Sequence, residues 1–438
     1  MTTVAEVRLW GRSIGAVSVE DARSAAAFQF TDEFTRSGIQ VSPLRMPLSD
    51  RVYSFPGLAR ETFHGLPGLL ADSLPDRFGN ALIDTWLATQ GRSAESFNAV
   101  ERLCYIGSRG MGALEFAPAQ GPKSRTSEPL DIAALVQLAS DVLSQRSGLR
   151  HSMASADTAE TLRDILRVGT SAGGARAKAV IAWNRQTNEV RSGQVAAGDG
   201  FDYWILKFDG VSGNRDKELE DPTGYGSIEY AYALMARAAG IDISECRLLE
   251  ENGRRHFMSR RFDRLAGGEK LHMQSLGALA HFDFNLAGAY SYEQALQVMR
   301  TLDLPMASIE QQFRRMAFNI VARNQDDHVK NIAFVMDRDG VWSLSPAFDV
   351  MYAYNPSGTW TASHQMSLAG KRAGFTLDDL KAVAETASMK RGRAEAIAHE
   401  VTKAISRWRE FAASAGVASR QVDMIADVHR LDLVSAEA

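Results

Sequence analysis

The alternation of apolar and polar residues near the start of the chain predicts a β-hairpin. VRLWGRSIGAVSV, residues 7–19, alternates around a central glycine. In the stretch 67–91, the helical spacing of Phe78, Leu82, Ile83 and Trp86 predicts a helix in its second half. A strand-like stretch ends near residue 117, and the breaker-rich APAQGPKSRTSEPL, residues 117–130, predicts a linker. The pattern therefore separates a first unit of about 117 residues from the rest.

Helices and strands alternate in the middle of the chain. Helical patterns cover 131–146 and 160–168, and a Gly-rich loop at 169–178 leads into an apolar, strand-like run. A second strand is expected at 202–210, and a helix over 228–242 that Gly240 closes. The stretch 245–264 predicts a hairpin that turns at Asn252-Gly253. From about Gln274 onward the pattern is mainly helical.

Composition limits the class of protein. A chain of 438 residues with 45% hydrophobic residues predicts two or three packed units. The net charge of −4 argues against strong autonomous binding to nucleic acid. Two distant cysteines, Cys104 and Cys246, fit a reducing compartment. The N-terminus has no secretory pattern and no apolar run is long enough to span a membrane, so we expect a cytoplasmic protein.

A crowded polar stretch, NQDDHVKNIAF at 324–334, stands directly before an apolar run. Asp326 and Asn331 form D-x-x-x-x-N, and IAFVM, DRDG and VWSL then read as a hairpin that ends shortly before Asp349. Phosphoryl transfer in kinases uses this order: an acid that accepts the hydroxyl proton, then an Asn and an Asp that hold Mg²⁺. The alternative is a solvated loop before a strand. Asp327 competes for the role of the base, although only Asp326 has the five-residue step to Asn331.

Two features upstream extend this pattern. Lys207 lies in the apolar strand YWILKF, where a buried ammonium needs a partner; phosphate and Glu229 are the candidates. Alternatively, its stem lies along a strand edge with the charge in water. Gly173 and Gly174 let backbone N–H groups approach phosphates, or they form a flexible turn. The loop is not a Walker A loop, because Ala175 and Arg176 follow the second glycine.

These pieces together resemble the HipA family of serine/threonine kinases, the toxins of type II toxin–antitoxin pairs. The resemblance rests on GTSAGGARAKAVI, WILKF, EYAYALMARAAGI, SRRFDR, NQDDHVKNIAF and LSPAFDV, and on VRLWGRSIG, GLLADSLPDRFG and YIGSRGMGALEFAP in the first unit. It implies an α+β, bilobal, protein-kinase-like fold. The expected parts are an N-terminal α/β domain at 1–117, a linker and helix at 118–150, an N-lobe at 151–265 and a mainly helical C-lobe at 266–438.

The resemblance also implies roles for individual residues. Asp326 is the expected catalytic base, Asn331 and Asp349 hold Mg²⁺, Glu229 pairs with Lys207, and Ser171, or the neighbouring Thr170, is autophosphorylated. The expected ATP contacts are Gly173, Gly174, Ala175, Arg176, Ala177, Lys178, Lys207, Arg260, Arg261, Phe262, His328, Lys330, Asn331, Phe348 and Asp349. One departure is Arg260, where the family often has an acid, so adenine contacts by that side chain are in doubt.

The family's partners give three hypotheses for the function. Known members phosphorylate aminoacyl-tRNA synthetases and are restrained by a small helix-turn-helix antitoxin of the HipB type. The resemblance thus implies a growth-arresting protein serine/threonine kinase that uses ATP and Mg²⁺ and reaches operator DNA only through its antitoxin. A small-molecule phosphotransferase would use the same acid and metal pattern. A non-catalytic co-repressor that only binds an antitoxin is the third possibility.

Overall fold

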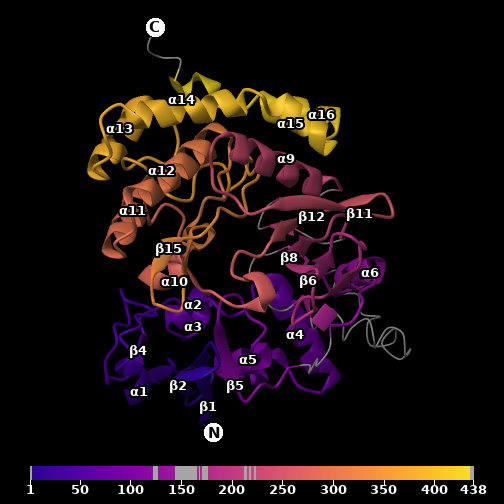
Figure 1. Ribbon diagram of the computed structural model, residues 1–438, viewed down its shortest axis with the longest axis vertical. Helices are drawn as coiled ribbons and strands as arrows, with labels where there is room; N and C mark the ends of the chain where they lie inside the picture. The colour runs from indigo at the N-terminus through magenta and orange to yellow at the C-terminus, as the bar shows by residue number, and fades with distance from the viewer. Residues whose placement is uncertain are drawn as a thin grey trace.

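The computed structural model describes residues 2–121, 127–143, 165–166, 168–169, 176–211, 215–216, 219–220 and 223–434. In Figure 1, the first unit lies at one end, a second sheet lies beside the middle of the molecule, and helices fill the other end. No helix in the described ranges is long and apolar enough to cross a membrane.

The first unit is built on a five-stranded antiparallel sheet in the order β4-β3-β2-β1-β5. The predicted hairpin is confirmed: Trp10 and Gly11, both with positive φ, connect β1 to β2 as a tight turn requires. The strands of this sheet are β1 (Thr3–Leu9), β2 (Arg12–Val19), β3 (Ala27–Phe30), β4 (Tyr53–Ser54) and β5 (Leu114–Ala117). Its helices are α1 (Asp32–Thr35), α2 (Arg60–Phe63), α3 (Gly68–Ala71), α4 (Arg77–Thr89) and α5 (Ala99–Ile106), with a 3₁₀ turn at Ala94–Ser96.

Helix α4 joins the first unit to the second sheet. Its buried Phe78 and Leu82 belong to the same apolar core as Trp204 and Leu206 of β8. The second sheet, also antiparallel and five-stranded, has the order β11-β12-β8-β6-β7. Its elements are β6 (Lys178–Asn184), β7 (Val190–Ser192), β8 (Phe201–Lys207), β11 (Cys246–Glu251) and β12 (Arg254–Arg260), with α6 (Ile132–Leu143) against it and the short pair β9 (Arg215–Asp216) and β10 (Leu219–Glu220) nearby.

The second predicted hairpin is also confirmed. Asn252 and Gly253 connect β11 and β12, with φ of 45° and 75°. The predicted helix is present as α9 (Tyr225–Ala238) and ends before Gly240. It begins four residues before Glu229, which therefore lies in its second turn and not at its start. Helix α9 packs on this sheet, and its inner face joins the large core of the helical lobe.

The helical lobe follows the sequence expectation. Its elements are β13 (His272–Ser275), α10 (Leu276–Ala280), α11 (Tyr292–Thr301), α12 (Met306–Val321), β14 (Ala333–Met336), β15 (Trp342–Leu344), α13 (Leu377–Thr386), α14 (Arg393–Ile405), α15 (Trp408–Ala415) and α16 (Ser419–Ala426), with 3₁₀ turns at Ala266–Gly268, Val329–Asn331 and Leu431–Val434. The hairpin expected after the polar stretch is β14–β15, and β13 adds to its other edge.

The first unit docks closely on the helical lobe. Helix α3 lies against α10, and a Cβ placed on Gly68 would come within 2.1 Å of the Ala278 carbonyl oxygen. Asp72, at the end of α3, accepts hydrogen bonds from the backbone N and the Oγ of Ser275 at 2.6 and 2.9 Å. These contacts fix the first unit against helix α10, which in turn packs on the 3₁₀ turn Val329–Asn331 of the polar loop.

Candidate active site

An open cleft of about 710 Å³ lies where the three parts of the chain meet. The second sheet contributes Lys178, Lys207 and Ser259, and helix α9 contributes Glu229. The helical lobe contributes residues 328–331 and 347–350, and the first unit contributes Asp72, Asp76 and Asn80 among others. The cleft therefore collects most of the polar residues singled out in the sequence.

Lys207 lies at the centre of the charges in this cleft. Its ammonium is 2.6 Å from Oε1 of Glu229 and 2.5 Å from Oδ1 of Asp349. Burial disfavours the charged form of Lys207, but the two carboxylates outweigh that effect and raise its pKa. The lysine is therefore a fixed cation that links the sheet, helix α9 and the loop after β15.

Positive charge is concentrated opposite Asp349. In the register of β6 and β8, Lys178 lies directly across from Lys207. Two like charges at facing positions repel each other unless anions lie between them. Burial would raise the pKa of Asp349, but Lys207 first, and then Lys178 and Arg176, hold it well below its usual range. These cations and the carboxylate suit a polyanion that is held together with a divalent cation.

Asp326 does not itself line the cleft, but its neighbours in the same loop, His328 and Asn331, do. Its Oδ1 accepts a 2.6 Å hydrogen bond from the indole N–H of Trp360, and its Oδ2 lies 3.9 Å from Nε2 of His328. The Asn331 side-chain amide donates to the Asp326 carbonyl oxygen at 2.9 Å, which closes the loop between the two residues. The carboxylate of Asp326 keeps 19% of its surface exposed, so a substrate hydroxyl can reach it.

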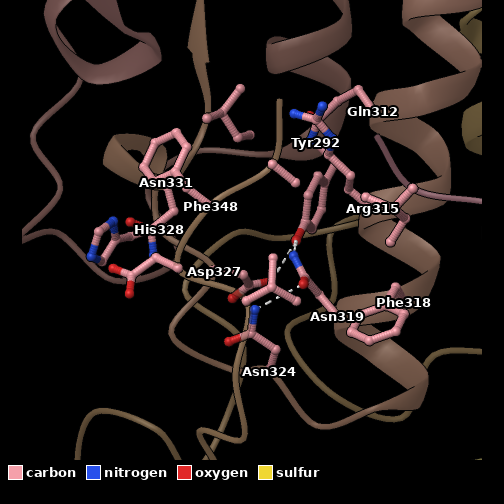
Figure 2. A pocket seen from close by; sticks show the side chains of 15 residues that line it. Tyr292, Gln312, Arg315, Phe318, Asn319, Asn324, Asp327, His328, Asn331 and Phe348 are labelled. Atoms are coloured by element: carbon pink, nitrogen blue, oxygen red, sulfur yellow. Dashed lines mark hydrogen bonds between the residues drawn. The ribbon is translucent and has the colours of Figure 1, made fainter. Parts of the chain in front are cut away.

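Asp327 has a different environment and does not fit the role of the base. Its carboxylate, 1% exposed, accepts hydrogen bonds from the Tyr292 hydroxyl at 2.6 Å, His364 Nδ1 at 2.7 Å and the Gln365 backbone N–H at 2.7 Å. Figure 2 shows the Tyr292 hydroxyl between Asp327 and Asn319, with hydrogen bonds to both. Burial therefore distinguishes the two aspartates: Asp327 is enclosed by its three hydrogen-bond donors, whereas Asp326 keeps part of its carboxylate exposed.

Asn331 and Asp349 have the donor chemistry that Mg²⁺ requires. Both line the cleft, on either side of the β14–β15 hairpin. Because Asn331 Nδ2 points to the Asp326 carbonyl, its amide oxygen points away from that bond and remains for a cation. Mg²⁺ in kinases takes few protein oxygens and completes its shell with phosphates and water. The described residues contain no cluster of three or more His, Cys, Asp or Glu side chains that could hold a metal.

Two family models match nearly the whole chain. The model described as HipA N-terminal domain matches residues 5–117, and the model described as HipA-like C-terminal domain matches residues 170–409.

The chain belongs to the HipA family.

Two solved structures align with this chain. A chain from the Shewanella oneidensis MR-1 toxin–antitoxin complex of HipA, HipB and operator DNA superposes with a TM-score of 0.68 at 16% identity, covering 98% of this chain and 96% of that one. The Helicobacter pylori proinflammatory kinase CtkA aligns with a TM-score of 0.32 at 11% identity, over 57% of this chain and 94% of that one. No curated protein sequence is significantly similar. The expected α+β, bilobal, kinase-like fold is confirmed.

The hinge region of this HipA-family chain uses its arginine side chains for structure. The guanidinium of Arg260 lies 2.8 Å from Asp202, and that of Arg261 is buried against Asp263, at 2.7 and 2.9 Å. The Arg261 side chain is 1% exposed, so any adenine contact at this position comes from its backbone. Phe262 and Phe348 do line the cleft, with ring centroids 5.7 Å apart.

Part of the predicted nucleotide loop lies outside the described residues: Thr170, Ser171, Gly173, Gly174 and Ala175. The loop's described end is buried, because Arg176, Ala177 and Lys178 have little exposed surface. Arg176 lies over the ring of Tyr225, 4.1 Å from its centroid. Arg176 therefore lies against the first residue of helix α9, two positions before β6 begins at Lys178.

Sequence reasoning missed several residues that hold the site in place. Trp360, Tyr292 and His364 are the side-chain partners of the two aspartates, and all three are far from them in the sequence. Asp76 in the first unit pairs with Lys330 of the polar loop at 2.7 Å. No local motif marks these residues, since their partners meet them only in the folded chain.

Proposed function

We propose that this HipA-family chain is a protein serine/threonine kinase that uses ATP and Mg²⁺. The observation that carries the proposal is the Lys207 ammonium, held between Glu229 of helix α9 and Asp349 in the cleft that Asn331 also lines. Protein kinases require both a lysine–glutamate pair between sheet and helix and an aspartate for Mg²⁺. Lys207, Glu229 and Asp349 supply side chains of these types in contact with one another, which supports the proposal.

Each residue then has a chemical task. Lys178 and Lys207 attract the phosphates, and the cluster of opposite charges keeps Lys207 in place. Asn331 and Asp349 would hold Mg²⁺, which neutralises charge on the transferred phosphoryl group when it is bound. Asp326 accepts the proton of the substrate hydroxyl, and the Trp360 indole and the closed loop orient its carboxylate. Positioning and charge neutralisation are the main contributions of a protein to such a transfer.

The biological setting is proposed from the family. We infer a growth-arresting toxin that acts in the cytoplasm and whose protein substrate belongs to the translation machinery, with an aminoacyl-tRNA synthetase as the first candidate. A HipB-like antitoxin would restrain it and connect it to operator DNA, as in the Shewanella oneidensis complex of HipA, HipB and operator DNA. Autophosphorylation of Ser171 would place a dianion beside the ATP phosphates and repel them.

Nucleotide binding tests the proposal first. We expect ATP with Mg²⁺ to raise the melting temperature of the wild-type chain by mass action, and we expect Asp349→Asn to lose most of the contribution of Mg²⁺. Asp339→Asn is a matched control, since Asp339 lies at the exposed turn of the β14–β15 hairpin and does not line the cleft. A wild-type melting temperature that ATP and Mg²⁺ leave unchanged would contradict the kinase and favour a co-repressor that only binds its antitoxin.

The class of acceptor needs a separate test. We expect labelled phosphate from ATP to appear on serine or threonine of proteins when the chain is incubated with a lysate of its host. Transfer to small alcohols with no labelled protein would instead identify a small-molecule phosphotransferase.

A further inference from the structure

The ion pair between Asp76 and Lys330 connects the first unit to the catalytic loop. Lys330 Nζ lies 2.7 Å from Asp76 Oδ1, and both side chains are 25% exposed. Both residues line the cleft that the nucleotide is proposed to enter.

The Asp76 carboxylate does not cap the helix that it precedes. It is the N-cap residue of α4, where an aspartate side chain ordinarily accepts a hydrogen bond from the first turn of the helix. Here the Asp76 side chain makes no capping hydrogen bond. Its carboxylate turns instead to Lys330, 254 residues away in the sequence. The Asp76 side chain therefore bonds to the polar loop and not to the first turn of its own helix.

Lys330 lies in the loop between Asp326 and Asn331, so its contact with Asp76 can affect the positions of both residues. It lies in the 3₁₀ turn Val329–Asn331, next to Asn331, whose backbone N–H and side-chain amide bond to the carbonyl oxygens of His328 and Asp326, each at 2.9 Å. The Lys330 ammonium lies 4.9 Å from the ring centroid of Phe284. Asn285, the next residue, bonds to Thr62 of the first unit at 2.8 Å. Displacing Lys330 would therefore shift the turn that carries Asn331 and the loop that carries Asp326.

We propose that Asp76 is a positioning residue for phosphoryl transfer, through which the first unit holds Lys330 and sets the geometry of the loop from Asp326 to Asn331. This inference rests on the proposed function. It assigns the N-terminal unit a part in the reaction itself, in addition to any part in binding partners.

The test measures the initial rate of labelled phosphate incorporation into the chain itself at varied ATP. Asp76→Asn keeps a side chain that can cap α4 and removes only the charge. We expect its maximal rate to fall about tenfold, the effect of losing one charge-assisted hydrogen bond, while the ATP concentration for half-maximal rate stays within about twofold. Asp76→Glu should recover much of the rate. Asp84→Asn, in the same helix and paired with Arg102 at 2.9 Å, should leave it unchanged.

A double-mutant comparison shows whether Asp76 acts through Lys330. In a Lys330→Met background, where the rate is already reduced, Asp76→Asn should cause no further loss. In hydrogen exchange without ATP, Asp76→Asn should also speed the exchange of the 326–331 amides. The hydrogen-exchange measurement keeps the inference testable if the rate of phosphate incorporation becomes too low to measure.

The remaining outcomes overturn the inference or the proposal beneath it. A wild-type rate in Asp76→Asn, an equal loss in both backgrounds, or an equal loss in Asp84→Asn would contradict the positioning role alone. A wild-type chain that incorporates no phosphate would contradict the proposed function, and the inference with it.

Discussion

The Lys207 ammonium lies 2.6 Å from the Glu229 carboxylate, which is 2% exposed. This contact joins the second sheet to helix α9, and the second ion pair of Lys207, with Asp349, extends it to the loop after β15. Without Glu229, the ammonium of Lys207 would be repelled more strongly by Lys178 on the neighbouring strand. The Lys207–Glu229 ion pair therefore both positions Lys207 in the cleft and offsets its positive charge.

Replacing Glu229 should therefore affect both stability and transfer. Glu229→Gln keeps the size of the side chain and leaves Lys207 with Asp349 alone. We expect a loss of about 1–2 kcal/mol in the free energy of unfolding, less than for a fully isolated buried pair, and a decrease of at least tenfold in phosphate incorporation. Urea denaturation and the labelled-phosphate assay measure the two effects.

A surface pair gives the control for this variant. Glu245→Gln removes a carboxylate that pairs with Arg185 but is 31% exposed, so its loss should cost well under 1 kcal/mol and leave transfer unchanged. Equal effects of the two variants would show that the position of Glu229 in the cleft has no special importance.

Asp327 should control stability in acid. Burial alone would raise its pKa, but the charge and hydrogen bond of His364, with further hydrogen bonds from Tyr292 and Gln365, lower it. A carboxylate whose pKa is lowered by folding adds stability above its unfolded pKa of about 3.9, and that stability is lost as the pH falls toward the folded value. Asp327→Asn should cost about 2–4 kcal/mol at pH 7 and weaken the dependence of stability on pH below about 4.

Urea denaturation at a series of pH values measures this effect. Asp50→Asn, at an exposed position, should leave the curve of stability against pH unchanged. A variant of Asp327 that is as stable as wild type at pH 7 would argue against its role as the anchor of the loop.

Gly68 should be essential for docking the first unit. A Cβ at this position would lie 2.1 Å from the Ala278 carbonyl oxygen, and backbone cannot move aside as a side-chain end can. We expect Gly68→Ala to cost about 1–3 kcal/mol and to increase proteolytic cleavage near α10. Gly57→Ala is the matched control, because a Cβ there meets no atom within 4 Å.

Local patterns in the sequence predicted the elements that depend on nearby residues. The Asn252-Gly253 turn, the amphipathic helix before Gly240 and the hairpin after Asn331 all follow from residues adjacent to them. The sequence analysis did not use the capping boxes that begin helices α5, α11 and α13, which are Asn98–Glu101, Ser291–Gln294 and Thr376–Asp379.

What the sequence could not supply is the tertiary environment of the site. Asp326 and Asp327 are equivalent in composition, and only the fold brings Tyr292 and His364 to one of them and Trp360 to the other. Arg261 and Asp263 are only two residues apart, but their ion pair is buried because Gly110 and Gly112 of the first unit also bond to it. Partners more than 30 residues apart leave no periodicity for sequence analysis to detect.

The most direct test of the account is the transfer of labelled γ-phosphate by the wild-type chain and by Asp326→Gln. We expect the wild type to incorporate phosphate with ATP and Mg²⁺. The variant should melt normally, bind ATP, and lose roughly a hundredfold or more of the rate, since general-base catalysis contributes about that much. Asp339→Asn, at the exposed turn of the β14–β15 hairpin, should behave as wild type. An Asp326→Gln variant that transfers phosphate at the wild-type rate would contradict the assignment of the base and of the site built around it.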